Sequence, residues 1–445
     1  MTGTLRKTPP PAPATGSAAP VRPAADEQHA PRRVVAGLVF TELLIGIGFA
    51  MPLVASLSLK VNEVAPHARE SVLASVIAAG AVASFILNPV FGHLSDRTTG
   101  RFGRRRPWIL GGLVAGLPAA AVMATATSAV QLGLGWVLAQ AAYNAALAAL
   151  AAVIADRIPA SQQATVSGLF GAAQFASVFP AFLLIGLIPH NTTLLLIIPG
   201  VAGAAGAFVS WALLRGDEAV PASERHPVSL RSVFTSLLFD PRTSPAFTAV
   251  WLQRFLLQGA NALIGTFGLY YLMSRLQMST AEAAALVSAT GMLAVVGNVV
   301  SAAVFGKLAS RTGAYRAFVV ASGLLMALSM AIKMLSASVW PIYFSTAIAA
   351  IGLGAFYAVD MALVLRVMPT SADAARWLGV FNIAKALPQS IAPLLAPVLL
   401  ALGTDPIGPA AGDKNYFALY LGGTLAALAA VALTPLIRHP GLARD

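Results

Sequence analysis

The stretch that decides the fold is GHLSDRTTGRFGRRRP, residues 92–107. It holds one acidic residue and five arginines between two long apolar runs. An arginine at the centre of a membrane costs roughly 2.5–3.5 kcal/mol, so this stretch is predicted to be a short loop at a membrane face. Loops rich in lysine and arginine stay on the cytoplasmic side, and this one therefore orients the chain.

The composition is typical of a polytopic membrane protein. Of the 445 residues, 57% are hydrophobic and 10% are charged, whereas soluble proteins have about 25% charged residues. The net charge of +12 is attributed to cytoplasmic loops and not to nucleic-acid binding. There is no cysteine, and the six histidines fall in tails, loops or span ends, so no metal site and no cofactor is expected.

Twelve apolar runs are long enough to cross a membrane as helices of about 20 residues. They are continuous and do not alternate, which argues against a β-barrel. The predicted spans are 34–58, 71–91, 107–127, 129–155, 164–188, 192–214, 245–272, 281–306, 316–335, 339–365, 377–402 and 416–437. The predicted fold class is an all-α integral membrane protein with twelve transmembrane helices.

The distribution of positive charge predicts the topology. With the N-terminus inside, the inner segments hold 22 lysines and arginines, the outer segments hold four, and three lie within spans. This bias predicts a multi-pass protein of the plasma membrane with both termini in the cytoplasm. The predicted parts are a disordered tail (1–31), a six-helix bundle (32–214), a cytoplasmic linker (215–244), a second six-helix bundle (245–437) and a short tail (438–445).

The two halves of the chain carry similar motifs. The segment 159–170 after span four recurs at 369–381 after span ten, a shift of 210 residues. The segment Gly92–Arg97 has a degenerate copy at Gly306–Arg311, a shift of 214 residues. Two motifs with nearly equal shifts indicate a duplicated six-helix unit. Paired repeats of this kind surround a central binding site in transporters.

The loop resembles the signature of the major facilitator superfamily, in which a glycine and an Asp-Arg pair precede a second glycine and several basic residues. The longer form SDRTTGRFGRRRPW, residues 95–108, is similar to the loop of the sucrose symporters and of the related glycoside–pentoside–hexuronide cation symporters. The segment GVFNIAKALPQ, residues 379–389, supports the same branch. The resemblance implies an alternating-access transporter in which spans one, four, seven and ten line a central cavity.

Charged residues inside spans are the candidates for function, because burying charge in a membrane is costly. Two acids, Glu42 and Asp360, and two bases, Arg254 and Lys385, lie well inside spans, with polar neighbours at helical spacing. The predicted substrate- and proton-binding residues are Glu42, Gln140, Asn144, Arg254, Gln258, Asn261, Tyr357, Asp360, Asn382, Lys385 and Gln389. The alternative is purely structural: charges that pair, such as Asp360 with Lys385, and amides that each make one interhelical hydrogen bond.

Proton coupling is the predicted mechanism. Burial raises the affinity of a carboxylate for protons and a nearby cation lowers it, so Glu42 or Asp360 is predicted to carry the proton, with Arg254 or Lys385 as a switchable counter-charge. The start of span two, residues 71–77, has no acid, which disfavours sodium coupling. Amides, tyrosines and the aromatic residues Trp251, Phe255, Phe356 and Tyr357 suit a polyhydroxylated ligand, and uptake of a sugar or glycoside is the predicted function.

Other functions remain as alternatives. A proton antiporter that exports a small organic molecule or drug would share the same fold. A membrane sensor or assembly factor is disfavoured because tails and loops are too short for a signalling module. No GxxxxGK[ST] phosphate loop and no catalytic constellation occur, so neither a primary pump nor an enzyme is predicted. The expected partners are a small-molecule substrate, protons and membrane lipids, and the chain is expected to be a monomer.

The arginine loop is also predicted to act in gating. By resemblance, Asp96 would face the start of span eleven, whose free backbone N–H groups favour an anion. Arginines of 101–106 would pair with Asp156, and these contacts would hold the two halves together while the cavity faces outward. The predicted gating residues are Gly92, Asp96, Arg97, Gly103, Arg104 and Asp156. Anchoring to anionic lipids through Arg105 and Arg106 is the alternative.

Overall fold

The computed structural model describes residues 30–98, 102–215, 239–242, 244–369, 374–409 and 414–437. Throughout these ranges the regular elements are all helices, as the apolar runs predict. The predicted N-terminal tail and the C-terminal tail lie outside the described residues except for Ala30 and Pro31, and so does most of the predicted linker. The boundaries of the two bundles therefore stay a prediction at those points.

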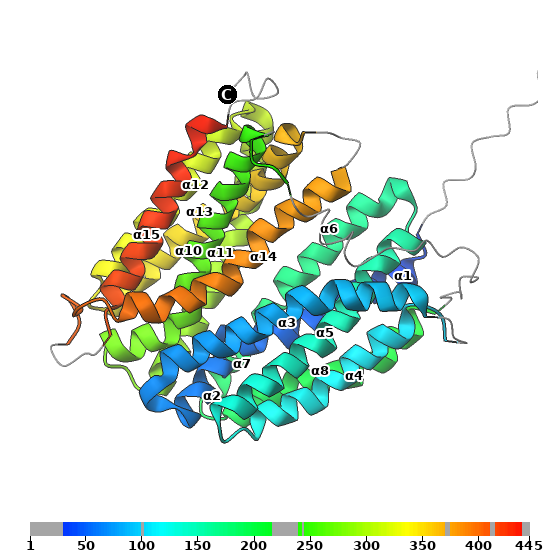
Figure 1. Cartoon of the computed structure of the whole chain (residues 1–445), viewed down its shortest axis with the longest axis horizontal. Helices are drawn as coiled ribbons and strands as arrows, with labels where there is room; N and C mark the ends of the chain where they lie inside the picture. The colour runs from blue at the N-terminus through cyan, green and yellow to red at the C-terminus, as the bar shows by residue number, and fades with distance from the viewer. Residues whose placement is uncertain are drawn as a thin grey trace, which may run out of the picture.

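The first bundle contains the six spans before the linker. Its elements are α1 (Arg32–Met51), the π-helical turn η1 (Pro52–Ser56), α2 (Leu57–Val64), the short turn η2 (Pro66–Ala68), α3 (Arg69–Arg97), α4 (Arg106–Ala124), α5 (Ala129–Arg157), α6 (Ala160–Ala176), α7 (Val178–Leu187) and α8 (Thr192–Leu213). Helix α5 packs between α3 and α4, and α4 also packs on α8 (Figure 1). Helix α1 runs on through η1 and α2 as one continuous span.

The second bundle contains the six spans after the linker. Its elements are α10 (Pro245–Arg275), α11 (Thr280–Thr312), α12 (Tyr315–Leu335), α13 (Val339–Val367), α14 (Ala374–Leu400), α15 (Tyr416–Ala432) and the closing turn η4 (Thr434–Leu436). Helix α13 packs on α11 and α12, while α10 packs on α14 and α15. The two copies of each repeated motif fall at equivalent places, since Gly92–Arg97 and Gly306–Arg311 both end the second span of a bundle.

Eleven helices of the described chain are long and apolar enough to cross a membrane. The twelfth predicted span, 245–272, is α10, a helix of 31 residues that is absent from those eleven. It interrupts its apolar sequence with Gln253, Arg254, Gln258 and Asn261. Helix α10 is therefore the most polar of the twelve spans, and its polar residues place charged side chains inside the bundle.

Span five is not the single helix that its apolar run predicts. It consists of α6 and α7, which meet at Ser177. Pro180 has no N–H to donate to the carbonyl of Ala176, four residues earlier, so the regular hydrogen-bond ladder is interrupted here. The Ser177 hydroxyl donates to the carbonyl of Gln174 at 2.6 Å. The break divides the span into a part that faces α1 and a part that packs on the second bundle.

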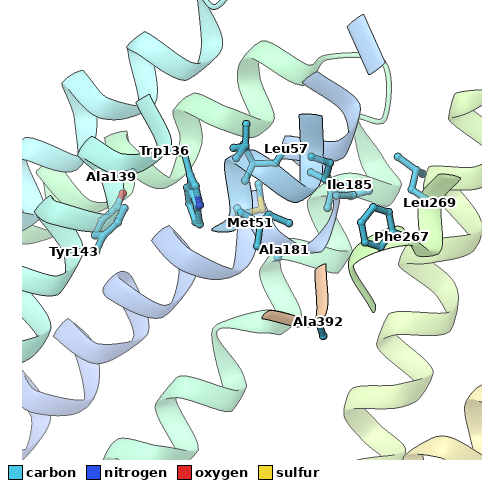
Figure 2. Close-up of a cluster of buried hydrophobic side chains, with 14 of the residues drawn as sticks. Met51, Leu57, Trp136, Ala139, Tyr143, Ala181, Ile185, Phe267, Leu269 and Ala392 are labelled. Carbon is cyan, nitrogen blue, oxygen red and sulfur yellow. The ribbon is translucent and has the colours of Figure 1, made fainter. Parts of the chain in front are cut away.

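The two bundles meet mainly through α3 with α14 and α7 with α11, and α10 also contacts η1 and α2. A shared apolar core joins them: Figure 2 shows Met51 and Ile185 of the first bundle near Phe267, Leu269 and Ala392 of the second. We call the end of the molecule that carries the loop after α3 the basic end, and the other end the opposite end. In Figure 1 the bundles meet at the opposite end and diverge toward the basic end.

Polar contacts also join the bundles at the opposite end. The Arg69 guanidinium of α3 donates to the Ser274 hydroxyl of α10 at 2.7 Å. The Tyr416 hydroxyl of α15 donates to the Glu70 carboxylate of α3 at 3.3 Å. Because these bonds form between side chains, they can break and reform without disturbing any helix.

Candidate functional site

The centre of the candidate site is an ion pair between α10 and α13. Arg254 Nη1 lies 2.8 Å from Asp360 Oδ2, and both side chains are 7% exposed. The guanidinium carbon of Arg254 lies 4.1 Å from the centre of the Phe381 ring on α14. A cation on an aromatic face gains further stabilisation when water is excluded. Three helices thus converge on one buried positive charge.

A second layer of polar groups surrounds this pair. The Tyr357 hydroxyl, one turn before Asp360, donates to Gln258 Oε1 at 3.4 Å, and Gln258 lies one turn after Arg254. Lys385 of α14 lies within electrostatic reach of both members of the pair. Lys385 was the example of a pairing partner predicted for Asp360 from the sequence. In the structure, Asp360 forms its direct ion pair with Arg254.

Apart from Arg254 Nη1, which faces Asp360 in the ion pair but makes no hydrogen bond, two buried donors at this site have no hydrogen-bond partner among the described residues, Arg254 Nε and Gln258 Nε2. A buried donor without a partner costs about 1–3 kcal/mol, and native proteins rarely tolerate it without a functional reason. Both atoms belong to α10 and are one helical turn apart. They form a pair of donors suited to the oxygen atoms of a ligand.

The first bundle contributes a different kind of acid. Glu42 of α1 is 1% exposed, and no base of the described chain forms an ion pair with it. Its Oε2 atom has no hydrogen-bond partner there either. An isolated ionised carboxylate in an apolar interior is very costly. The two acids predicted together therefore occupy opposite bundles and different electrostatic surroundings.

The amides of α5 form a closed network. Asn144 Oδ1 accepts from Ser84 and Asn88 of α3, each at 3.1 Å. Asn144 Nδ2 donates to the Gln140 carbonyl at 2.8 Å and to its side-chain oxygen at 3.1 Å. All four hydrogen-bonding positions of this amide are filled. Sequence reasoning did not select Ser84 and Asn88, although their i, i+4 spacing on span two is the same signal that selected the α5 amides.

We expect Asn144→Ala to lower stability more than substrate affinity. Its loss leaves polar groups on α3 and α5 without partners, which costs about 1–3 kcal/mol. Thermal unfolding of the detergent-purified protein measures the loss, and the KM for transport should change less than twofold. The control is Asn382→Ala, since Asn382 is exposed and a surface change costs about 0.5 kcal/mol or less. A large rise in KM at an unchanged Tm would restore Asn144 to the binding site.

The remaining predicted polar residues do not join the ion pair directly. Asn261, Asn382 and Gln389 are exposed, so the predicted stripe on α10 divides into a buried part and an exposed part. Besides Phe381, an aromatic ring of the first bundle reaches the site: Phe175 of α6, whose centre lies 5.6 Å from that of Tyr357. Phe175 was not among the residues predicted from the sequence, although it lies next to the polar face of span five.

Aromatic residues proposed for ligand stacking are used in helix packing instead. Trp251 Nε1 donates to the Val380 carbonyl at 2.9 Å, and its ring stacks on Phe255 at 5.4 Å. Phe356 is 2% exposed in the core.

The arginine loop holds the ends of three helices of the first bundle together. Asp156, at the end of α5, accepts from Arg104 at 2.7 Å and from Arg105 at 2.9 Å. Arg105 also pairs with Asp96 of α3 at 2.5 Å. Gly103 has a φ of +86°, which a side chain at that position would strain. The loop can therefore turn sharply enough to place two arginines on one carboxylate.

These contacts correct one expectation. The pairing of loop arginines with Asp156 is present, but both partners belong to the first bundle, so this pair cannot hold the two halves together. Asp96 is paired within its own loop, and its side chain is 53% exposed. The segment 370–373 that leads into α14 lies outside the described residues, so the expected contact with the start of span eleven stays a prediction.

The family can be identified from a match over about two thirds of the chain. A family model described as Major Facilitator Superfamily matches residues 34–332. The chain belongs to the major facilitator superfamily. A short match to "Uncharacterized symporter sll1374" of Synechocystis sp. is 50% identical over 40 residues, which is 9% of this chain and 7% of that protein.

Solved structures agree with the family. The chain is similar to the D-xylose-proton symporter (TM-score 0.67, 16% identity, 90% of this chain and 97% of that one). It is also similar to the nucleoside transporter NupG (0.66, 12%, 92% and 99%). A third is a bacterial homolog of the human lysosomal transporter Spinster in an inward-facing, occupied conformation (0.64, 15%, 91% and 94%). At these identities the likeness shows the fold, and the predicted fold class is confirmed.

Membership of the superfamily makes this chain a multi-pass membrane protein of a transporter family. In the part of the chain that the structure describes, no group of three or more acids and histidines is placed to hold a metal ion.

We expect Asp156→Asn to destabilise the first bundle by about 1–2 kcal/mol, because Arg104 and Arg105 lose their shared carboxylate. The Tm of the purified protein should fall by several degrees. Asp96→Asn is the matched control, and its more exposed side chain predicts a smaller loss. An equal fall in Tm for both variants would contradict the assignment of Asp156 as the main anchor.

Proposed function

We propose that the chain is a secondary active transporter that works by alternating access and takes up a sugar or glycoside together with protons. The observation that carries this proposal is the buried pair of Arg254 and Asp360 beside two unsatisfied donors on α10. A charge pair in the middle of a membrane protein is costly to maintain for structure alone. Its place beside free donors suits a coupled substrate and proton site.

The proposed coupling step is an exchange of partners. Substrate hydroxyl groups accept hydrogen bonds from Arg254 Nε and Gln258 Nε2. The competing interaction weakens the hold of the guanidinium on Asp360, which then takes up a proton. Lys385 provides the second positive charge that holds Asp360 ionised when no substrate is bound. Glu42, which has no counter-charge in the described structure, is the second candidate proton carrier.

Several comparisons support the substrate class. Two of the similar structures are named for D-xylose and for nucleosides, and both ligands carry hydroxylated rings. The short sequence match is named as a symporter. The loop 95–108 and the segment 379–389 resemble the sucrose and glycoside–pentoside–hexuronide symporters. Uptake of a hydroxylated substrate is the function on which these observations converge.

We further propose that the structure is the state open to the cytoplasm. The positive-inside rule places the basic end there, with both termini, in the plasma membrane of a monomeric transporter. The bonds from Arg69 to Ser274 and from Tyr416 to Glu70 close the opposite end. These bonds must break in the other state. The arginine loop acts by stiffening the first bundle, and an Asp96→Asn variant with unchanged transport rates would limit the loop to a topology signal.

The test is uptake of labelled sugars by proteoliposomes with an imposed proton gradient. Saturable, gradient-driven accumulation of a disaccharide or glycoside supports the proposal. Glu42→Gln and Asp360→Asn should both be tested, and retention of proton-driven accumulation in both variants would overturn the coupling mechanism. Binding of hydrophobic amines without uptake of any sugar would favour the antiporter that exports small organic molecules.

A further inference from the structure

A large apolar groove lies on the outer face of the first bundle. It has a volume of about 700 Å³ and is lined by Phe91 of α3 and by side chains of α4 and α5. Helix α5 packs between α3 and α4 (Figure 1). Small residues line most of its length, whereas Phe91 and Trp108 stand at the basic end, with ring centres 5.6 Å apart. It is separate from the Arg254–Asp360 site, which belongs to the second bundle.

The glycines of α4 show how the groove arises. A Cβ at Gly112 would lie 2.4 Å from the Ala142 carbonyl, so α4 and α5 can approach closely at this point. A Cβ at the neighbouring Gly111 would meet nothing within 4 Å. One glycine therefore permits the helix contact, and the other leaves open space beside it. The groove is a built feature of this helix pair.

The groove is long enough to hold a lipid chain through the whole depth of one leaflet. From Trp108 to Val122 the rise along α4 is about 21 Å, and one leaflet of the membrane core is about 15 Å thick. Tryptophan prefers the level of the headgroups, which is where Trp108 lies if the loop is at the membrane face. Its indole N–H donates to the Thr98 hydroxyl at 2.7 Å.

Positive charge gathers at one end of the groove. Each of the three helices that form it carries an arginine at its basic end: Arg97 is the last residue of α3, Arg106 the first of α4 and Arg157 the last of α5. Arg97 is exposed. A basic cluster at the headgroup level attracts anionic lipids. The apolar groove and the arginines together match the two parts of one molecule.

We propose that this groove binds the acyl chain of an anionic phospholipid whose headgroup lies beside Arg97 at the end of α3. The bound lipid would fill the space beside Gly111 and hold α4 against α3 at a place where protein packing is incomplete. The acyl chain of a neutral lipid would also fill the groove, but only an anionic headgroup is attracted by the positive charge at its end.

The test is native mass spectrometry of the full chain extracted from vesicles that hold equal amounts of palmitoyl-oleoyl phosphatidylglycerol and phosphatidylcholine. Wild type should retain phosphatidylglycerol at least about fivefold over phosphatidylcholine, as expected for one arginine near a headgroup. Gly111→Leu fills the groove and should lower retention about tenfold. Gly168→Leu is the control, because a Cβ at Gly168 also meets nothing within 4 Å.

The charge is tested separately. Arg97→Gln should lower the preference for phosphatidylglycerol about fivefold, whereas Arg311→Gln, the equivalent position in the second bundle, should leave it unchanged. If Gly111→Leu does not fold, Ala115→Leu at the exposed wall of the groove replaces it. Equal retention of both lipids, undiminished retention in the filled variants, or a dimer that Gly111→Leu dissociates would each overturn the proposal.

Discussion

Asp360→Asn is expected to reduce gradient-driven uptake at least about 100-fold. The substitution leaves Arg254 buried without its carboxylate, and removing one partner of a buried pair lowers stability by about 3–5 kcal/mol. It also removes the group proposed to take up the proton. Uptake of labelled sugar by proteoliposomes with and without a proton gradient is the measurement.

Stability and coupling can be separated by two further variants. The double variant Arg254→Gln/Asp360→Asn removes both charges, so its Tm should recover toward that of wild type while uptake stays lost. Asp405→Asn is the matched control, because the pair of Arg275 and Asp405 is also buried and has the same 2.8 Å separation, but lies at the opposite end. This control should lower the Tm yet keep uptake dependent on the proton gradient. Wild-type uptake by Asp360→Asn would contradict the proposed role.

Gly291→Ala is expected to shift the protein away from the conformation described here. The added Cβ would lie 2.1 Å from the Phe182 ring, at the contact between α7 and α11 that joins the bundles. Overpacking of a tight contact costs about 1–3 kcal/mol, which is a shift of roughly 5- to 150-fold in the conformational equilibrium. The two bundles must move apart at this point to accept the methyl group.

The shift is measured by labelling a single engineered cysteine with a hydrophilic maleimide. The chain has no cysteine of its own. The maleimide therefore labels only the cysteine introduced by Gln174→Cys, at an exposed position of α6. Labelling should slow about tenfold or more in Gly291→Ala. Gly265→Ala is the control, since a Cβ at Gly265 meets nothing within 4 Å. An unchanged labelling rate in Gly291→Ala would show that the α7–α11 contact does not control the conformation.

The comparison of α10 with α5 shows how far polar patterns predict a site. Both helices carry amides at helical spacing, and both were expected to bind substrate. On α5 the network with α3 fills every hydrogen-bonding position of Asn144. On α10 the Gln258 Nε2 atom is left without a partner among the described residues. Spacing tells which side chains share a face, but the neighbouring helix decides whether that face is already satisfied.

Ion pairs between residues far apart in the sequence show the same limit of prediction from local patterns. Arg275 was counted as a base of an outer segment, yet its side chain is fully buried against Asp405, which is 130 residues away. Glu42 and Asp360 were grouped as equivalent acids, but only Asp360 has a base beside it in the described structure. Nothing in the local sequence of either acid differs in a way that would reveal this.

The sequence by itself determined the number of spans, the position of the arginine loop and the short list of buried charges. These follow from the cost of placing charge and free backbone groups in a membrane, which acts on each segment separately. Only the tertiary structure decided that Arg254 pairs with Asp360, that the loop arginines brace one bundle, and that the bundles meet at the opposite end. These depend on which helix faces which, and that choice is made by packing among side chains far apart in the chain.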